Sequence, residues 1–436
     1  MTESFLSEPP GLTSDDVGRF SRQIMCEGIS AAGMIKIRNS KVVCVGLGGL
    51  GSTIALYLCA AGVGKMTFID HDEVDVSNLH RQVIHSTEQV GVKKVDSAKE
   101  ACLRIYPDAC IETVEEMISL TNATRLFADC DVVVDGTDNV ASRYIINDAA
   151  MLCKRPLVSG SAMRWEGQLS VYGYKEGPCY RCLFPVPPPA AAVGSCNDTG
   201  VVGPLPGMIG CLQALETLKI IADAGETLSG RLFVFDGRRF TSRVVKLRGR
   251  NPDCTACGAS ALSSETLPPR EEYVPTCCAV GAAYSAGVLS ASQRTSIEEF
   301  GKWYTNRHTL NTPDRVSLVV DVRARIQYSM AYLPDSVNLP LSELQRWRSE
   351  GEEICRFKFF HFLEEAIKSS EGTKHVTVFF ICRRGVASTQ ATELLSKVIP
   401  TLPAEVTPHV TLDRIVNVDG GLNAYHSQVD AGFPYY

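Results

Sequence analysis

The stretch Lys41–Gly51, Lys-Val-Val-Cys-Val-Gly-Leu-Gly-Gly-Leu-Gly, determines the fold of the first half of the chain. Its apolar start predicts a buried strand, and Gly46, Gly48 and Gly51 then form the pattern G-x-G-x-x-G directly before a helical stretch. Such glycines let the backbone approach phosphates, whose charge the N-terminus of the helix stabilises. Taken alone, the pattern points first to NAD or FAD, and it is a weak indicator of which nucleotide binds.

The same strand, turn and helix alternation continues outward from this stretch. Lys65–Asp70 and Asp131–Asp135 predict further strands, and helices are expected around 94–106 and from about residue 141. Apolar strands alternating with helices predict a parallel sheet that is covered on both faces. A second alternation of this kind follows residue 294.

The length of 436 residues corresponds to about three domains, or to two with insertions. We expect an N-terminal tail at 1–16, a first α/β domain at 17–262, a linker rich in Ala, Ser and Pro at 263–294, and a smaller α/β domain at 295–436. The sequence shows no internal repeat, so the two halves are predicted to be different enzyme-like domains.

Composition and charge exclude several classes of protein. Hydrophobic residues make up 45% and the net charge is −6, which argues against disorder and against direct binding of nucleic acid. The acidic N-terminus does not resemble a secretory signal. The uncharged stretch 42–64 is read as a strand, a glycine turn and a helix, so no membrane span is expected. Seventeen cysteines without a signal indicate a reducing compartment, and we expect a cytosolic protein.

Polar residues at successive strand ends favour a nucleotide other than NAD. Asp70 ends the second strand at the position of a ribose-binding acid; Asn78, Arg81 and Lys94 follow, and a later strand runs into Asp135-Gly-Thr-Asp138-Asn139. Each of these residues alone fits an ordinary surface charge. Together they supply the cations that neutralise a triphosphate and a carboxylate that holds Mg²⁺, which nucleotidyl transfer needs.

Two Cys-x-x-Cys pairs predict a metal site. The pairs are Cys179 with Cys182 and Cys254 with Cys257, each flanked by polar or turn-forming residues. Four thiolates in this arrangement suit a closed tetrahedral zinc site with a structural role, at one zinc per chain. A redox Cys-x-x-Cys is the competing interpretation for either pair alone.

Two further cysteines lie in settings that suggest reactivity. Cys196 lies in a Pro/Gly-rich loop where an exposed thiol would reach an activated acyl group, although a lone cysteine is more often a small buried apolar residue. Cys382 ends an apolar strand and opens Cys-Arg-Arg-Gly-Val-Ala-Ser388 before a helix. The loop N–H groups and Arg383 and Arg384 would stabilise a thiolate or persulfide. A tyrosine phosphatase would need Arg at position 388, where this chain has Ser.

Several sequence motifs in the two halves of the chain resemble those of known families. GLGGLGS, FIDHDEVDVSNLHRQ, VGVKKVDSA, DGTDN and GPLPGMIGCLQALE look like the ThiF/MoeB family, the bacterial relatives of ubiquitin-activating enzymes. The Cys382 loop, with Asp321-Val-Arg323 and Asn417 to Tyr425, resembles the rhodanese domain. Joined in one chain, they resemble the eukaryotic adenylyltransferase and sulfurtransferase of this family, and imply a Rossmann-like adenylation domain with a structural zinc, plus a smaller α/β rhodanese domain.

The resemblance implies a role for each matching residue. It implies Gly49 at the phosphates, Asp70 on the ribose and Lys94 beside the phosphates, with zinc on the four paired cysteines and thioester or acyl-disulfide chemistry at Cys196. Asp138 would bind the Mg²⁺ of Mg-ATP, with Asn139 adjacent. Arg22 matches an arginine that family members lend across a homodimer interface. An ordinary arginine on a helix surface is an equally good interpretation of this residue. The residues implied to line the nucleotide are Ser77, Asn78, Leu79, His80 and Arg81.

The implied function is ATP-dependent adenylation of the C-terminal glycine of a ubiquitin-like sulfur-carrier protein that ends in Gly-Gly, followed by persulfide transfer from Cys382 to make a thiocarboxylate. The sulfur donor would be thiosulfate or a cysteine desulfurase persulfide, and the product would serve tRNA wobble-uridine thiolation, molybdopterin synthesis or both. The alternatives are an activating enzyme that passes the modifier on for conjugation, an NAD-dependent oxidoreductase fused to a rhodanese-like module, and a non-catalytic scaffold.

Overall fold

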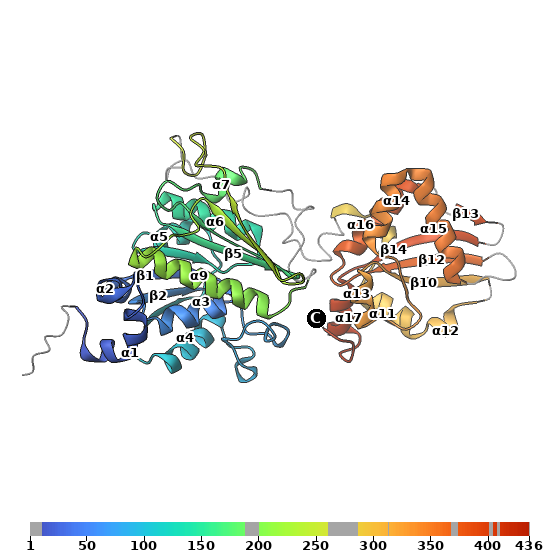
Figure 1. Cartoon of the computed structure of the whole chain (residues 1–436). Coiled ribbons are helices and arrows are strands. Elements are labelled where there is room, and N and C mark those ends of the chain that lie inside the picture. The colour runs from blue at the N-terminus through green and yellow to red at the C-terminus, as the bar shows by residue number, and fades with distance from the viewer. Residues whose placement is uncertain are drawn as a thin grey trace, which may run out of the picture. The chain divides into compact units, whose positions relative to one another are not determined.

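The structure, a computed structural model, describes residues 11–187, 200–259, 287–312, 314–367, 374–400, 404–407 and 410–435 (Figure 1). The chain divides into two units, Met1–Pro275 and Thr276–Tyr436, and each has its own sheet. The division falls inside the segment 263–294 that the sequence predicts as a linker.

The first unit is built on an eight-stranded sheet in the order β3-β2-β1-β4-β5-β6-β7-β8. Strands β1 to β5 run parallel, and β6, β7 and β8 continue the sheet as antiparallel strands. The chain moves from β1 outward to β2 and β3 and then returns to β4 on the other side of β1. The strands are β1 (Lys41–Val45), β2 (Lys65–Ile69), β3 (Cys110–Val114), β4 (Val132–Asp135), β5 (Leu157–Met163), β6 (Glu166–Tyr172), β7 (Arg231–Asp236) and β8 (Thr241–Lys246).

Helices cover both faces of this sheet, as the strand pattern predicts. Because side chains alternate along a strand, Val42 and Cys44 of β1 enter one core and Val43 and Val45 enter the other. Helices α2, α3, α4 and α9 contribute to the first core, and α5 and α6 contribute to the second. The helices are α2 (Ser30–Asn39), α3 (Gly49–Ala60), α4 (Lys94–Ile105), α5 (Leu120–Phe127), α6 (Val140–Leu152) and α9 (Pro204–Ala222).

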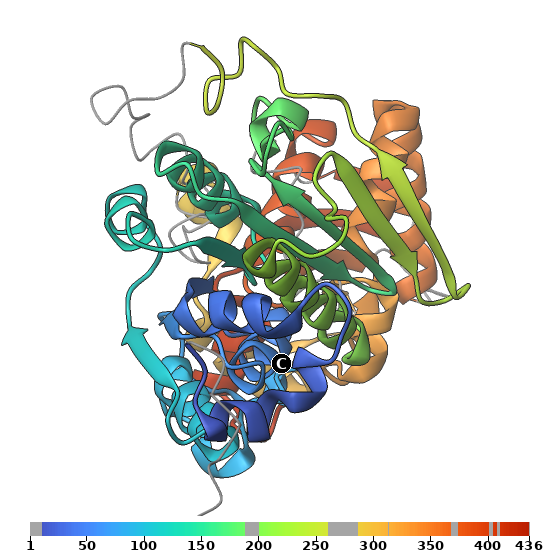
Figure 2. The ribbon, with the colours of Figure 1, turned by 60° about the vertical axis from the view of Figure 1, so that its left-hand side comes forward.

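Helix α9 is the one described helix that is long and apolar enough to cross a membrane, with a mean hydropathy of 1.3. It packs against α3 and β5 (Figure 2). Its buried residues include Ile209, Gln213 and Ala214. A core helix of an α/β unit has this composition for the same physical reason, since it is apolar on several sides. The stretch 42–64 forms β1, a glycine turn and α3, as the sequence predicts.

The second unit has a sheet in the order β11-β10-β12-β14-β13, with β9 paired to β14. Strands β10, β12 and β14 are parallel and buried between two apolar clusters. Helices α14, α15 and α16 contribute to one cluster, and α11 and α17 contribute to the other. The elements are β9 (Arg294–Thr295), α11 (Ile297–Thr305), α12 (Arg307–Leu310), β10 (Arg315–Asp321), α13 (Arg325–Met330), β11 (Val337–Asn338), α14 (Leu341–Glu350), α15 (Glu352–Ile367), β12 (Lys374–Ile381), α16 (Val386–Val398), β13 (Ala404–Thr407), β14 (Val410–Val418) and α17 (Gly421–Gln428).

Candidate functional sites

The strand order changes direction at β1, because β2 and β3 lie on one side of it and β4 on the other. Three loops therefore meet at the carboxyl ends of these strands, which form one edge of the first sheet. The glycine loop follows β1, Asp70 follows β2, and the loop from Gly136 to Asn139 follows β4. Val45 is in register with both Ile69 and Asp135, so the three loops start side by side. Ligands of open α/β sheets bind at such a topological switch point, beyond the carboxyl ends of the strands.

The glycine loop is closely packed where its glycines lie. A Cβ atom on Gly51 would lie 2.0 Å from the Gly46 carbonyl oxygen, and one on Gly136 would lie 2.8 Å from the same atom. Gly46 has a φ of +85°, which favours glycine. Gly49 begins α3, and a Cβ there would lie 3.1 Å from Pro206 of α9 and 3.5 Å from the Arg81 side chain. The loop therefore offers the N-terminus of α3 beside an arginine.

Asp70 fixes the glycine loop through its carboxylate. Its Oδ2 accepts a hydrogen bond of 2.7 Å from the Leu47 N–H, and its Oδ1 accepts one of 2.9 Å from the Asp72 N–H. Asp72 Oδ2 in turn accepts a hydrogen bond of 2.7 Å from Lys94 Nζ. Lys94 is the first residue of α4 and its side chain is buried, so this ammonium is held close to the same sheet edge.

The segment after β2 forms a short 3-10 helix, η1 (Val76–Asn78), capped by Asp75, which accepts hydrogen bonds from the Ser77 N–H and hydroxyl. Arg81 donates to Asn78 Oδ1 at 2.6 Å, and its Nη1 lies 2.8 Å from His80 Nε2. Burial lowers the pKa of His80, and the Arg81 guanidinium lowers it further, so this imidazole is neutral at neutral pH. The segment also contains Leu79, which is partly buried.

The loop after β4 has one buried and one exposed carboxylate. Asp135 is fully buried and accepts from the Thr137 N–H and hydroxyl, from Ser159 Oγ and from Arg143 Nε. Asp138 is exposed, and Asn139 caps α6 by accepting from the Ser142 N–H at 2.8 Å. The buried Asp135 orders the loop, and the exposed Asp138 places a second carboxylate at the same end of the sheet.

The edge formed by these loops has groups that suit the phosphates of a nucleotide. A helix N-terminus and the cations Arg81 and Lys94 suit phosphates. Gln82 adds a second indication, because its Oε1 is buried without a hydrogen-bond partner and its Nε2 would lie 3.6 Å from a Cβ on Gly48. Buried polar atoms are normally paired, so this amide has capacity for a ligand.

Arg22 and Cys196 are different cases. Arg22 is exposed in the last turn of α1 (Ser14–Ile24). Helix α1 is held by a capping box between Thr13 and Asp16 and by an ion pair of 3.0 Å between Asp16 and Arg38. Cys196, together with Cys277 and Cys278, lies outside the described residues.

The two Cys-x-x-Cys pairs converge on one point, as the zinc hypothesis requires. Cys179 and Cys182 flank the start of α7 (Tyr180–Leu183), and Cys254 and Cys257 follow β8; all four are buried. The sulfur–sulfur distances are 3.8 Å for Cys179–Cys182, 3.6 Å for Cys179–Cys254 and 3.4 Å for Cys182–Cys257.

These distances fit a tetrahedral ion. Four sulfurs bound at about 2.3 Å lie about 3.8 Å from one another. A hydrogen bond from Cys179 lowers the pKa of the Cys257 thiol to about 5, so this residue is a thiolate at neutral pH. The backbone N–H of Asn251 also points to Cys182 Sγ, at 3.3 Å. Four buried thiols around one point leave no position for water, which is the structural type of zinc site.

In the second unit, Cys382 directly follows β12 and its sulfur is enclosed by the next loop. The Gly385 N–H donates to Cys382 Sγ at 3.1 Å, and Ser388 Oγ lies 3.3 Å from the same sulfur. Gly385, with a φ of +85°, is the N-cap of α16. The side chain is only 3% exposed. A loop N–H and a helix N-terminus are thus directed at one sulfur, an arrangement typical of anion-binding loops.

The two other segments that resemble the rhodanese domain lie at the start of α17 and at the end of β10. The Leu422 N–H, in the first turn of α17, donates to the Cys382 carbonyl oxygen at 2.8 Å, and a Cβ on Gly421 would lie 2.2 Å from that oxygen. Asp321 and Arg323 form a buried ion pair at the end of β10, and Asn338 donates to both of their carbonyl oxygens.

Comparisons with known proteins agree with both halves. Residues 20–256 match the ThiF family, and residues 305–428 match the rhodanese-like domain. Proteins named adenylyltransferase and sulfurtransferase MOCS3 are 39% identical in Culex quinquefasciatus and 37% identical in Arabidopsis thaliana. The alignments cover 98% and 100% of this chain and 90% and 89% of those proteins.

The chain belongs to the MOCS3 family of adenylyltransferases and sulfurtransferases. It is therefore both an adenylyltransferase and a sulfurtransferase, with an ATP-binding ThiF domain and a rhodanese domain. Membership of this family supports an activity in which a sulfur carrier is activated and sulfur is transferred. The predicted fold and family are confirmed. The crystal structure of E. coli MccB with ATP shares the fold, with 21% identity and a TM-score of 0.50 over 57% of this chain and 77% of that chain.

For this MOCS3 family member, the described residues bring together the predicted loops at one sheet edge and the predicted cysteines at one point. Their individual functional roles remain predictions. Sequence reasoning assigned no role to the buried Asp135, to Arg143 or to Gln213, which donates to the Asp135 carbonyl oxygen at 2.7 Å. The available signal was the carboxylate at the end of an otherwise apolar strand, which requires a partner when buried.

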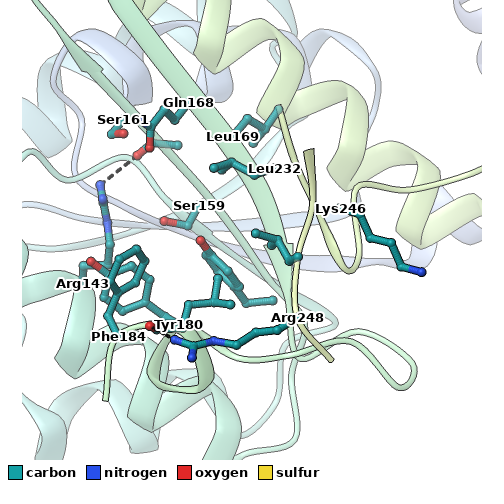
Figure 3. A pocket seen from close by; sticks show the side chains of 14 residues that line it. Arg143, Ser159, Ser161, Gln168, Leu169, Tyr180, Phe184, Leu232, Lys246 and Arg248 are labelled. Atoms are coloured by element: carbon teal, nitrogen blue, oxygen red, sulfur yellow. Dashed lines mark hydrogen bonds between the residues drawn. The ribbon is translucent and has the colours of Figure 1, made fainter. Parts of the chain in front are cut away.

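A pocket of about 370 Å³ is lined by residues of β5, β6, β7, α6 and α7 and by the segment that ends β8 (Figure 3). Arg143 and Phe184 lie on the left of the view and Lys246 on the right, with Tyr180 and Leu232 between the two sides. Arg143 donates to the Gly160 carbonyl oxygen at 2.9 Å. The pocket therefore combines apolar walls with cationic side chains and begins at the residues that order the β4 loop.

Proposed function

We propose that this protein uses Mg-ATP to adenylate the C-terminal glycine of a ubiquitin-like sulfur carrier that ends in Gly-Gly, and then replaces the activated oxygen with sulfur carried as a persulfide on Cys382. The observation that carries the proposal is the joint presence, in one chain, of a phosphate-binding sheet edge and an enclosed cysteine whose loop N–H points at its sulfur.

The first step requires positioning more than proton transfer. The carboxylate of the carrier is already anionic at neutral pH, so it attacks the α-phosphorus of ATP directly and pyrophosphate leaves. The N–H groups at Gly49 and the charges of Arg81 and Lys94 neutralise the phosphates. Asp138 and the adjacent Asn139 are the residues that would hold Mg²⁺, which supplies further charge neutralisation when bound. Asp70 is assigned to the ribose, with Ser77, Asn78, Leu79 and His80 around the nucleotide.

The second step uses the electrophilic adenylate. The outer sulfur of the Cys382 persulfide attacks the acyl carbon, a carbon–sulfur bond forms, and AMP leaves. A thiol then attacks Cys382 Sγ, the sulfur–sulfur bond breaks, the thiocarboxylate leaves with its electron pair, and a disulfide forms between that thiol and Cys382. Cys196 is proposed to take part as the first acyl acceptor or as this resolving thiol. Arg383 and Arg384 favour an anionic sulfur donor such as thiosulfate, and a desulfurase persulfide is the donor proposed in the cell.

The pocket that includes Arg143 is a candidate binding site for the carrier tail. An extended peptide that ends in a carboxylate suits a pocket with apolar walls and with Arg143, Lys246 and Arg248 in its lining. The zinc is proposed to be structural, at one ion per chain, because its four ligands tie the segment after β6 to the segment after β8.

The wider setting follows the family. We propose a homodimer in which Arg22 reaches the nucleotide of the partner subunit, a cytosolic location, and a role of the thiocarboxylate in wobble-uridine thiolation of tRNA, in molybdopterin synthesis or in both. No direct contact with nucleic acid or membrane is part of the proposal.

The test is mass spectrometry of candidate carriers incubated with the protein, Mg-ATP and a sulfur donor. Replacement of one terminal oxygen by sulfur supports the proposal, and the change must disappear without ATP and with Cys382→Ala. A carrier joined to other proteins with no thiocarboxylate would favour the conjugation alternative. No ATP consumption with any Gly-Gly carrier would overturn both, and binding of NAD with no binding of ATP would restore the oxidoreductase hypothesis.

A further inference from the structure

The segment 183–187, Leu-Phe-Pro-Val-Pro, begins at the last residue of α7 and contributes its first two residues to the lining of the pocket. In a continued helix, the Leu183 carbonyl oxygen would accept from the N–H four residues further on. That position is Pro187, which has no N–H group. The Arg248 guanidinium, which comes from the segment after β8, donates to this carbonyl oxygen instead. A side chain thus replaces the backbone donor that proline removes.

Tyr144 of α6 holds the middle of this segment. Its hydroxyl lies 3.0 Å from the Phe184 carbonyl oxygen and 3.2 Å from the Val186 carbonyl oxygen. Both oxygens only accept, and the single hydrogen of the hydroxyl is available to either of them. The Tyr144 side chain is buried, and burial raises the pKa of its phenol to about 12, so the hydroxyl keeps its hydrogen. The donor therefore stays engaged with this segment.

The carbonyl group between these two is held by Arg181. Arg181 Nη1 donates to the Pro185 carbonyl oxygen at 3.3 Å. The guanidinium is itself fixed on α6, because Nε donates to Asp148 Oδ1 at 2.8 Å and Nη2 donates to Asp148 Oδ2 at 2.7 Å. Its central carbon also lies 4.8 Å from the centre of the Tyr144 ring. Helix α6 thus determines where the backbone of residues 184–186 lies.

This backbone carries one wall of the pocket. Phe184 lines the pocket beside Tyr180, and the centres of the two rings lie 4.9 Å apart (Figure 3). Phe184 is 51% exposed, so packing against the rest of the unit covers only half of it. The position of this wall must therefore depend largely on the hydrogen bonds that hold its backbone.

We propose that Tyr144 is a positioning residue for the carrier tail: its hydroxyl holds the backbone at Phe184 and Val186 and so orders, before binding, the wall that the tail meets. This inference rests on the proposed function, in which the pocket receives the tail. A wall that is already ordered avoids the entropy cost of ordering it during binding. Tyr144 acts through this backbone and not by touching the tail.

The test removes only the hydroxyl. Tyr144→Phe in the full chain is assayed by ATP–pyrophosphate exchange, with a ubiquitin-like protein ending in Gly-Gly that supports exchange in the wild type. The KM for this carrier should rise about fivefold, while kcat and the KM for ATP stay within about twofold. Tyr106→Phe makes the same change at a buried tyrosine that follows α4, and it should leave all three values unchanged.

A carrier without its C-terminal tail shows which part of the carrier meets the wall. It cannot be adenylated, and it competes with the intact carrier through its folded part. Its inhibition constant should be the same for the wild type and Tyr144→Phe, because the wall meets the tail alone. Weaker inhibition of Tyr144→Phe, in proportion to the rise in KM, would overturn the assignment to the tail.

Phe184→Ala tests the wall itself, and the half-exposed position makes unfolding of this variant a small risk. It should raise the KM for the carrier at least as much as Tyr144→Phe, and the double variant should show less than the combined effect of the two. An unchanged KM for the carrier in either single variant, a parallel rise in the KM for ATP, or independent effects in the double variant would overturn the inference. A wild type without exchange activity on any Gly-Gly carrier would instead reject the proposed function itself.

Discussion

The Asp135 carboxylate, fully buried at the end of β4, lies 3.3 Å from the Arg143 Nε of α6. The same carboxylate also accepts hydrogen bonds from the Thr137 N–H, the Thr137 hydroxyl and the Ser159 hydroxyl. With Arg143 Nε these make four donors, which order the loop that ends in Asp138. A buried carboxylate with this many partners is stabilising only as a complete set, because each partner compensates part of the cost of removing the charge from water.

Breaking this set should destabilise the first unit. We expect Asp135→Asn to lower its free energy of unfolding by about 3 kcal/mol, because the Arg143 guanidinium then remains without its carboxylate. The loss in the double variant Asp135→Asn, Arg143→Met should be smaller than the sum of the single losses. Urea unfolding measures both, and thiosulfate sulfurtransfer verifies that the second unit is intact. Additive losses would show that the pair is not coupled.

The zinc site predicts a stoichiometry and a stability effect. Freshly purified protein should contain about one zinc per chain, and Cys257→Ser should lose the metal and lower the melting temperature of the first unit, since four ligands join two distant segments. Cys26→Ser, which changes an exposed cysteine outside the cluster, is the matched control and should retain the metal. Metal analysis that finds no zinc in the wild type would contradict the assignment.

The capping box of α1 predicts a pH-dependent contribution to stability. Burial alone would raise the pKa of Asp16, but hydrogen bonds from the Thr13 N–H and hydroxyl and the charge of Arg38 outweigh it and hold the pKa below its ordinary value. A depressed pKa adds stability above the unfolded-state pKa, near pH 4, and that stability is lost as the pH falls through the folded-state pKa.

Asp16→Asn should therefore cost about 1 kcal/mol at pH 7 and progressively less below about pH 4. Denaturant unfolding of the wild type and the variant at several pH values measures the difference. A cost that is the same at pH 7 and pH 3 would show that the loss comes from packing and not from the charge of Asp16.

Cys382 should be required for one activity only. Cys382→Ala should abolish thiosulfate:cyanide sulfurtransfer and leave carrier-dependent pyrophosphate exchange intact, because each unit has its own sheet and core. Cys26→Ser again serves as the control. Loss of both activities in Cys382→Ala would indicate misfolding instead of a catalytic role.

The outcome of sequence reasoning differed between the loops and the network that holds them. The glycine pattern, the strand-end acids and the paired cysteines were readable because local spacing alone determines where a strand end or a Cys-x-x-Cys turn places its side chains. The bonds from Asp135 to Arg143 and from Leu47 to Asp70 were not readable. They depend on how α6 and the segment after β2 pack on the sheet, which no local spacing in the sequence encodes.

The proposed exchange of Arg22 across a dimer can be tested by mixing two inactive proteins. Arg22→Ala and Asp138→Ala should each lose carrier-dependent pyrophosphate exchange while remaining folded, and Asp108→Ala, at an exposed aspartate, should retain it. In a symmetric dimer, Arg22 of each subunit serves the nucleotide of the other. A mixed dimer then has one site with both an intact arginine and an intact aspartate, so an equal mixture that re-equilibrates should recover about a quarter of the wild-type activity. If Arg22 instead acts within its own subunit, every site in the mixture carries one defect, and no activity should return.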